Sequence, residues 1–522
     1  MKKIILICAL LHFAINDVYS QAADIEVNWG PVMKTKDSDF NNIIGSNDQF
    51  FYTVGYQSTG ISIGAFRVGA SRDLVIKKYS RENYRALKTT VVEKFEYQDE
   101  KAMFFDAILE GNIVHLYYRV YNNKIDKKFM ISRTISESGV VSAPSEISEV
   151  PADKKYEADF NMYTSKDSTK ILVFANLPYE KHESEKFSMT VLDMNYNVLW
   201  TREVTLPYTD KYFGIVESTV SNNGDVFVLG YATPDKTKGE RKKRKTPNES
   251  YKLLRINGED EIVEFDLGLD DIFVTSPDIL ADFKDETMTV SGFYSKEDRG
   301  AIGGSFYITV DQNLLEAKTA SREPFSKKFL QNFMSERKAK KGRELGAFKF
   351  KEFVRRDDGG AVIVAEQEYT YITSTTTANG ATTYTTYYVN NDIIVININP
   401  DGSIEWSTYI AKEQTTSSTG FYLSYVMLVE GSRLHFIYND DRKNLERLGE
   451  GKDVKTMKNP KKSVSVIATV DSEGNVSYDQ LFRNKDMSAI LVPKKCMNTS
   501  EGNALIYGVK GSKTRFGEIS FR

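Results

Sequence analysis

Cysteine and histidine are scarce in this chain of 522 residues, which contains two cysteines and four histidines. Disulfide-rich scaffolds and Cys/His zinc sites need several such residues at short spacings. Cys8 lies in an apolar segment near the N-terminus, so a mature chain without that segment keeps only Cys496. The sequence therefore excludes an intramolecular disulfide in the mature protein, and it predicts neither a metal site nor a cofactor.

An excess of charge of one sign is also missing. The chain carries 69 basic and 72 acidic residues, for a net charge of −3, and 41% of its residues are hydrophobic. These values exclude disordered, collagen-like and nucleic-acid-coating proteins. The chain lacks a Gly-x-Ser-x-Gly elbow, a His-Glu-x-x-His helix and a phosphate-binding loop. We expect a folded, aromatic-rich protein with no nucleic-acid partner.

No apolar run is long enough to cross a bilayer, which takes ~20 residues. The longest, Ile4–Ile15, follows a basic start and precedes Val18-Tyr19-Ser20, which has small residues at the −3 and −1 positions of a cleavage site. Residues 1–20 are therefore predicted to be a signal peptide, with Gln21 as the mature N-terminus. We expect a bacterial protein in the periplasm, at the outer membrane or outside the cell. Neither a lipid anchor nor a transmembrane span is expected.

Short β-branched and aromatic runs bounded by turn residues recur along the chain. Residues 213–268 show the pattern most plainly, as four such runs separated by a loop and by the turns Ser221–Asp225 and Asn257–Asp260. Runs of this kind are typical of antiparallel strands. The same order returns every ~40–60 residues, as in repeat architectures.

This repeat predicts an all-β fold, namely a single β-propeller of eight four-stranded blades over residues 21–522. The strand Ile25–Trp29 is expected to complete the last blade and close the ring. Seven blades are the alternative count, and a pair of β-sandwiches is the alternative architecture. The predicted blades cover residues 39–93, 101–149, 157–206, 213–268, 275–321, 346–410, 420–483 and 489–522.

Two stretches carry a family resemblance. Asp193–Trp200 and Asp401–Trp406 look like the blade endings of quinoprotein-type propellers, but they lack that family's Ala-x-Asp-x-x-Thr-Gly-Lys core, so no quinone is implied. Residues 387–406, followed by Ser424-Tyr425 and Leu434–Asp440, resemble an uncharacterised family of exported bacterial β-propeller proteins. The resemblance implies the fold and the export, and it implies no site residues.

The long connections fall on one side of the predicted propeller. They are the basic loop 232–250, the helical crossover 322–345, the Thr/Tyr hairpin arm 367–389 and the basic loop 439–462. Within three of these regions, residues 236–245, 327–343 and 441–462 together carry a charge of +16 in a chain of net −3. Such charge runs are typical of solvated loops. They also suit an electrostatic funnel for an anionic polysaccharide, lipid head group or protein of the cell envelope.

The residues predicted to bind this ligand come from three of the connections. In the crossover, an apolar stripe along residues 325–343 predicts an amphipathic helix that packs on the propeller or inserts into a membrane surface. The arm turns at Asn379-Gly380 and offers tyrosines that can stack on sugars or peptide, or only stabilise each other across the strands. The predicted ligand-binding residues are Arg241, Lys242, Lys243, Arg244, Lys245, Lys340, Lys341, Tyr384 and Tyr387.

Acidic residues recur on the strands expected nearest the propeller axis. Such carboxylates can line a channel and hydrolyse glycans, or they can accept hydrogen bonds from backbone amides. His115 and His435 occupy matching strand positions, which indicates packing. We therefore expect a non-catalytic binding protein, with a glycan-active enzyme as the alternative. The acidic residues are Asp106, Asp159, Glu217, Asp278 and Glu352.

Overall fold

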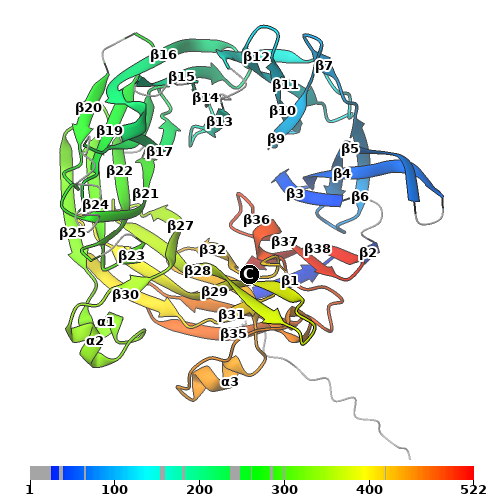
Figure 1. Ribbon diagram of the computed structural model, residues 1–522. Helices are drawn as coiled ribbons and strands as arrows, with labels where there is room; N and C mark the ends of the chain where they lie inside the picture. The colour runs from blue at the N-terminus through cyan, green and yellow to red at the C-terminus, as the bar shows by residue number, and fades with distance from the viewer. Residues whose placement is uncertain are drawn as a thin grey trace, which may run out of the picture.

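The chain forms a succession of antiparallel sheets arranged around a ring (Figure 1). The predicted signal peptide, residues 1–20, lies outside the described residues, as do 235–246 of the first basic loop and His182. Among the described residues, eight sheets contain four or five strands each, which confirms the all-β prediction. The computed structural model describes residues 25–34, 39–63, 66–152, 159–178, 183–234, 247–259, 262–282, 286–297, 300–417 and 419–521.

We number the sheets 1 to 8 in chain order. Sheet 1 contains β3 (Asp39–Ser46), β4 (Phe50–Ile63), β5 (Phe66–Ser80) and β6 (Ala86–Val92). Sheet 2 contains β9 (Met103–Glu110), β10 (Ile113–Asn122), β11 (Lys127–Ile135) and β12 (Ser145–Pro151). Sheet 3 contains β13 (Asp159–Thr164), β14 (Lys170–Asn176), β15 (Ser184–Asp193) and β16 (Val198–Thr209). Sheet 4 contains β17 (Phe213–Val220), β18 (Val226–Ala232), β19 (Ser250–Ile256) and β20 (Val263–Asp266).

The later sheets follow the same order. Sheet 5 contains β21 (Phe273–Asp282), β22 (Thr287–Ser295), β24 (Gly304–Asp311) and β25 (Ala317–Pro324). Sheet 6 contains β27 (Phe348–Arg355), β28 (Ala361–Thr376), β29 (Thr382–Ile398), β30 (Ile404–Ile410) and β31 (Gln414–Thr416). Sheet 7 contains β32 (Tyr425–Glu430), β33 (Arg433–Asp440), β34 (Val464–Val470) and β35 (Val476–Arg483). Sheet 8 contains β36 (Met497–Asn498), β37 (Ala504–Lys510), β38 (Lys513–Phe521), β1 (Ile25–Trp29) and β2 (Met33–Lys34).

Short elements lie between the sheets. Two small sheets pair β7 (Glu96–Tyr97) with β8 (Glu100–Lys101) and β23 (Ala301–Ile302) with β26 (Leu345–Gly346). The described helices are α1 (Lys327–Leu330), α2 (Glu336–Lys340), α3 (Asn444–Gly449), η2 (Asp210–Tyr212), η4 (Pro460–Lys462) and η5 (Pro493–Lys495).

The core lies between neighbouring sheets. The middle strands are buried on both faces, and all nine residues of β22 are buried. Each sheet therefore packs against the sheets before and after it, unlike the paired sheets of two β-sandwiches. Between sheets 4 and 5, for example, Phe227 and Leu253 share a cluster with Met288 and Phe306. Such clusters turn a row of sheets into one continuous core.

Two tryptophans fix neighbouring sheets to each other. The indole N–H of Trp200, at the end of the first quinoprotein-like stretch, donates to the carbonyl of Gly224 in sheet 4 at 3.2 Å. That of Trp406, in the second stretch, donates to Ser472 of sheet 7 at 2.9 Å. The resemblance of these stretches therefore corresponds to an equivalent contact between sheets.

The two ends of the chain meet in sheet 8. The strand β1 pairs antiparallel with β38, with Ile25 opposite Phe521, as the sequence predicts. Sheet 8 also packs on sheet 1, where the ring of Phe51 lies 5.1 Å from that of Phe516. Phe516 belongs to the same buried cluster as Tyr79 and Leu505. The first and last sheets are thus neighbours in the ring.

The crossover and two loops differ from the prediction. Instead of one helix over 325–343, the crossover contains α1 and α2, because the chain turns after Leu330 and Ser335 begins a second helix. The second basic loop contains α3, which the sequence analysis did not predict. Strands β4 and β5 extend into an arm from sheet 1, also unexpected (Figure 1).

Replacing the buried side chain of β1 tests the pairing of the chain ends. We expect Ile25→Ala to lower the free energy of unfolding by about 2–4 kcal/mol, because a 6% exposed side chain leaves a cavity in the cluster of sheets 7 and 8. Asn28→Ala, at an exposed position of the same strand, is the control and should change little. Equal effects in urea denaturation would show that β1 is not held by its core contacts.

Candidate functional site

The antiparallel order places the connections of each sheet at two ends. Turns between the first and second strands, and between the third and fourth, form what we call the turn face. Connections between the second and third strands, and between sheets, form the loop face. The crossover, the Thr/Tyr arm and the second basic loop all belong to the loop face. Binding residues concentrate in such connections because the sheets hold them in place.

A cavity of about 670 Å³ lies between the crossover and the base of the arm. Its wall includes apolar side chains of the crossover and sheet 6, and charged or polar groups from both sides. The lining residues include Phe333, Lys338, Arg343, Glu344, Phe348, Gln367 and Asp392. The cavity thus joins two regions that the sequence marked separately.

Aromatic packing holds the crossover in position. Ser326 caps α1 by accepting a hydrogen bond from the backbone N–H of Phe329 at 3.1 Å. Phe329 is buried, and its ring packs edge-on against Phe333. Phe333 in turn contacts the rings of Phe348 and Tyr409, with centroids 5.8 and 5.1 Å away. The apolar stripe therefore packs on the sheets, and it is not available for insertion into a membrane surface.

The charges of the cavity are only partly neutralised. The guanidinium of Arg343 lies 3.3 Å from the carboxylate of Glu297. The ammonium of Lys338 has no carboxylate within ion-pair distance among the described residues. Burial raises the pKa of Asp392 to about 6, and its Oδ1 accepts a hydrogen bond from the backbone N–H of Lys412.

Two smaller cavities on the loop face are also lined by lysines. One, of about 290 Å³, lies against Lys455, Lys458 and Lys462 of the second basic loop. The other, of about 210 Å³, lies between Lys458 and Lys461 on one side and Thr416 of β31 on the other. Within the described part of the chain, Lys458, Lys461 and Lys462 form no ion pair. Three cavities of one face therefore carry cations.

The predicted lysines of the crossover, Lys340 and Lys341, are not among the residues that line the cavity of about 670 Å³. Lys340 forms an exposed ion pair with Glu336 one turn earlier. Lys341 is exposed at the end of α2. Lys338 of α2 and Arg343, three residues after the helix, line the cavity instead. Arg241, Lys242, Lys243, Arg244 and Lys245 lie outside the described residues.

The Thr/Tyr arm has the predicted hairpin form. β28 and β29 pair as far as Thr376 and Thr382, and Gly380 takes a φ of 83° that favours glycine in the turn. Tyr384 is 72% exposed. Tyr387 is half-buried rather than exposed, because its ring stacks on that of Tyr371 with centroids 4.9 Å apart. The stacked pair agrees with mutual stabilisation across the strands, and the exposure of Tyr384 leaves its ring accessible.

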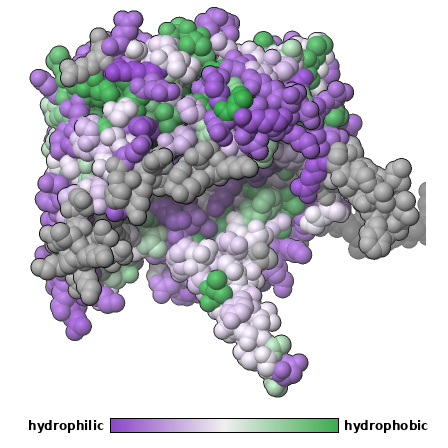
Figure 2. Space-filling view, turned by 45° about the horizontal axis from the view of Figure 1, so that its top comes forward, coloured by the Kyte–Doolittle hydropathy of each residue, from purple (hydrophilic) through white to green (hydrophobic). Residues whose placement is uncertain are grey.

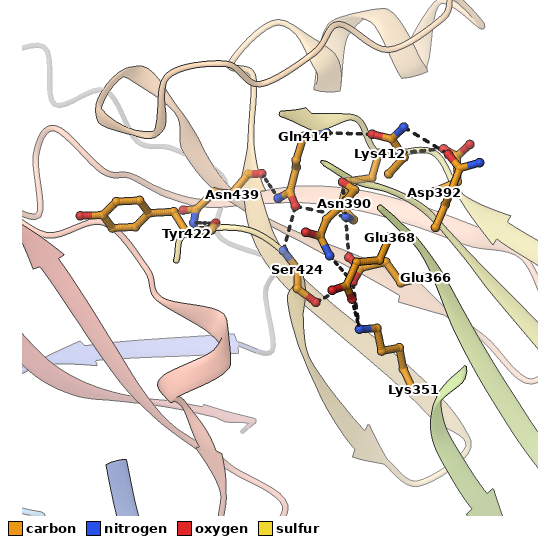
Figure 3. A network of polar contacts seen from close by, with 12 residues as sticks. Lys351, Glu366, Glu368, Asn390, Asp392, Lys412, Gln414, Tyr422, Ser424 and Asn439 are labelled. Atoms are coloured by element: carbon orange, nitrogen blue, oxygen red, sulfur yellow. Dashed lines mark hydrogen bonds and ion pairs between the residues drawn. The ribbon is translucent and has the colours of Figure 1, made fainter. Parts of the chain in front are cut away.

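A buried charged network anchors the arm (Figure 3). Lys412 and Glu366 are both fully buried, and the ammonium lies 2.8 Å from Oε1 of the carboxylate. Lys412 also donates to the Asn390 carbonyl and to Gln414 Oε1. Glu366 Oε2 accepts from Asn390 Nδ2 and from Ser424 Oγ at 2.8 and 2.7 Å. Burial lowers the pKa of Lys412, while Glu366 opposes that shift.

The network continues into the neighbouring sheets. Gln414 Nε2 donates to the carbonyl of Asn439, whose own Nδ2 donates to the carbonyls of Tyr422 and Leu491. At the next residue of β33, burial raises the pKa of Asp440 to about 7. Its Oδ1 accepts from Asn444 Nδ2 at 2.7 Å, which holds α3. This network was not predicted from the sequence. Its one signal is Glu366, which directly follows the apolar run Ala361–Ala365, because a charged residue buried at such a position needs a partner of opposite charge.

The acidic residues of the innermost strands satisfy backbone donors. Asp106, Glu217 and Asp278 each accept a hydrogen bond from the N–H of the following residue, where the strand register shifts. Asp159 likewise accepts from the N–H of Phe160, and it also pairs with Arg119 at 2.7 Å. Burial raises the pKa of Glu352. Burial also raises the pKa of Glu217, and the charge of Asp278 adds to that shift.

The two matching histidines have equivalent surroundings. Nε2 of His115 lies 3.3 Å from Glu110, and Nε2 of His435 lies 3.3 Å from Glu430. Each glutamate ends the first strand of its sheet. Burial lowers the pKa of both histidines. This repeated pair agrees with a packing role, and the described residues contain no group of three or more metal-ligating side chains.

Comparisons with known proteins identify no family. No family model and no curated protein matches the chain. The chain is similar to a Bacteroides caccae protein of unknown function, in a match that covers 70% of this chain and 94% of the other at 9% identity and a TM-score of 0.28. The match to the β-propeller domain of the Trilobed protease from Pyrococcus furiosus covers 86% of this chain and 97% of that domain, at 9% identity and a TM-score of 0.36. The match to polysaccharide lyase Uly1 covers 94% of this chain and 99% of the lyase, at 9% identity and a TM-score of 0.36.

These structural neighbours include both enzymes and a protein of unknown function. At such TM-scores and identities the likenesses assign no function to this chain. Separately, no helix among the described residues is long and apolar enough to span a membrane.

Breaking the buried ion pair tests whether it holds the arm. We expect Lys412→Met to lower the free energy of unfolding by about 3–5 kcal/mol, because it leaves the Glu366 carboxylate buried without its cation. The double variant Lys412→Met/Glu366→Leu should regain part of this loss in urea denaturation.

Lys340→Met is the matched control, since it removes one partner of an exposed ion pair. It should leave stability nearly unchanged. If both single variants have the same small effect, the buried pair does not constrain this region.

Proposed function

We propose that this chain is an exported, eight-bladed β-propeller that binds an anionic ligand of the cell envelope or extracellular space through its loop face, without catalysing a reaction. The eight blades are the eight sheets. Two observations support a closed ring: β1 pairs with β38, and a buried aromatic cluster joins sheets 8 and 1. Closure protects sheet edges that would otherwise attract other strands.

Export rests on the sequence of residues 1–20, with their basic start, apolar core and small residues before Gln21. The mature protein would then lie in the periplasm, at the outer membrane or outside the cell. Mass spectrometry of the exported protein should give a chain that begins at Gln21. A mass that includes residues 1–20, or an added acyl group, would contradict this part of the proposal.

The observation that carries the binding proposal is the set of unpaired lysines at the loop-face cavities. Lys338, Lys458 and Lys461 line cavities and have no ion-pair partner within the described residues. Other lysines of the loop face are paired with a nearby carboxylate, as Lys340 is with Glu336. Unpaired cations gathered at concave sites attract anions and raise their local concentration. If these lysines served only to keep the loops solvated, they would not need to line cavities.

We expect the triple variant Lys338→Gln/Lys458→Gln/Lys461→Gln to bind an acidic polymer such as polygalacturonate at least about fivefold more weakly than the unaltered protein. Binding should also weaken from about 0.1 M to about 1 M salt, as the Debye length falls from ~10 to ~3 Å. Titration calorimetry measures both effects. The melting temperature should hardly change, since exposed charges contribute little to stability.

The control is Lys166→Gln/Lys318→Gln/Arg433→Gln, which removes the same charge from the turn face. It should bind as the unaltered protein does. Equal weakening by both triple variants would mean that the net charge of the protein, and not the position of the lysines, determines binding. Binding that does not depend on salt would mean that these lysines do not bind the ligand. The variant with serine at 241–245 extends the test to the first basic loop.

A glycan-active enzyme is the second candidate. The supporting observation is that Glu217 and Asp278 lie on neighbouring innermost strands and that burial raises the pKa of both. The charge of Asp278 raises the pKa of Glu217 further. Acids with raised pKa values suit general acid catalysis. Release of reducing ends from any glycan in the binding assays, abolished by Glu217→Gln at unchanged melting temperature, would favour the enzyme over the binding protein.

A further inference from the structure

We infer that the Thr/Tyr arm and the cavity at its base form one elongated site for a linear acidic polysaccharide. This inference rests on the proposed binding function and narrows the anionic ligand to one chemical class. It is carried by a row of tyrosines that begins beside the cavity.

The row lies on one side of the arm. Side chains alternate along a strand, so Gln367, Tyr369 and Tyr371 of β28 share one side, and the register places Tyr387 opposite Tyr371. The rings of Tyr369 and Tyr371 have centroids 6.5 Å apart, and Tyr371 stacks on Tyr387. Gln367 lines the cavity. The aromatic row therefore reaches the cavity, which contains Lys338 and Arg343 as well as Glu344 and Asp392.

Beyond Glu368, which pairs with Lys351 at its base, the arm carries no charge. Residues 369–391 contain no Asp, Glu, Lys or Arg, whereas the surrounding loops are rich in lysine. The projecting arm is accordingly of intermediate hydropathy along most of its length (Figure 2). The hydroxyl groups of Tyr369, Tyr371, Tyr384 and Tyr387 make no hydrogen bond within the described residues. An uncharged row of rings and free hydroxyl groups suits sugar rings, which present C–H groups and hydroxyl groups together.

Charge at the base of the arm selects an acidic polymer. Lys338 lies in the cavity beside β28, and Lys458 and Lys461 lie in the cavity beside β31, which pairs with β29. The arm thus stands with cations along both of its edges. A chain of sugars on the tyrosines would extend toward these cations and place its carboxylate groups there. Pairing an anion with such unpaired lysines is favoured because it neutralises them.

The composition of the arm argues against a lipid surface. Its distal part, residues 373–383, consists of Thr, Ser, Ala, Asn and Gly, and Ile372 is the nearest large aliphatic side chain, 66% exposed. Insertion into a bilayer needs a larger apolar face. An acidic protein that adds a strand to the arm is a separate possibility, and the experiment below distinguishes it.

The experiment measures binding of the full-length mature protein to four probes: polygalacturonate, neutral dextran, polyglutamate and vesicles that contain anionic lipid. We expect polygalacturonate to bind most tightly. Tyr371→Ala/Tyr387→Ala should weaken that binding roughly tenfold, because each ring contributes a modest stacking energy. Tyr371→Phe/Tyr387→Phe should have a smaller effect, since it keeps the rings and removes only the hydroxyl groups.

Thr375→Ala/Thr383→Ala, a directly opposed pair on the same side nearer the tip, is the control and should bind normally. Circular dichroism melting checks that all variants are folded. The inference about the arm is wrong if Tyr371→Ala/Tyr387→Ala binds as well as the unaltered protein while the triple lysine variant binds more weakly. The proposed anion binding would then stand. If neither set of variants changes binding, both are wrong. Preference for vesicles or polyglutamate would identify a lipid or protein ligand instead and overturn the inference.

Discussion

The middle strands of each sheet are buried on both faces, and only the neighbouring sheets can cover them. In β22 every residue is buried, and in β33 only Arg433 at the first position is exposed. A strand of this kind cannot lie on the surface, because exposing either face would lose the burial of several large side chains. Each sheet must therefore have two neighbours, and the arrangement of sheets around a ring provides them, including sheets 8 and 1. Connections at the two ends of the sheets remain free to vary.

That freedom is used unequally. The turn face consists of tight connections such as Ser221–Asp225, while the loop face carries the crossover, the arm and the basic loop. The loop face also contains the buried pair of Lys412 and Glu366, which couples β28, β29 and sheet 7. Burying two charges is costly unless their remaining hydrogen bonds are made, and here Asn390, Gln414 and Ser424 make them. The network therefore fixes the base of the arm relative to the lysine-lined cavities.

Rigidity at the base has a consequence for recognition. The tyrosine row and Lys338 come from segments separated along the chain, yet both are held by packed elements: the row by strand pairing, the lysine by the Phe329–Phe333–Tyr409 contacts. A ligand that meets both would lose little affinity to ordering the protein, since the positions are set before it binds. Flexible basic loops would not have this property.

The sequence by itself determined the strands, their grouping in fours and the pairing of Ile25–Trp29 with the C-terminal segment, because β-branched runs and turn residues act locally and the alternation of side chains follows from strand geometry. It also marked the arm through Asn379-Gly380. Only the tertiary structure decided which cations face a cavity: Lys338 does, while Lys340 pairs with Glu336, since this depends on where α2 begins and on the aromatic contacts that hold it. The same holds for Lys412 and Glu366, 46 residues apart, whose pairing depends on the register of three strands brought together by burial.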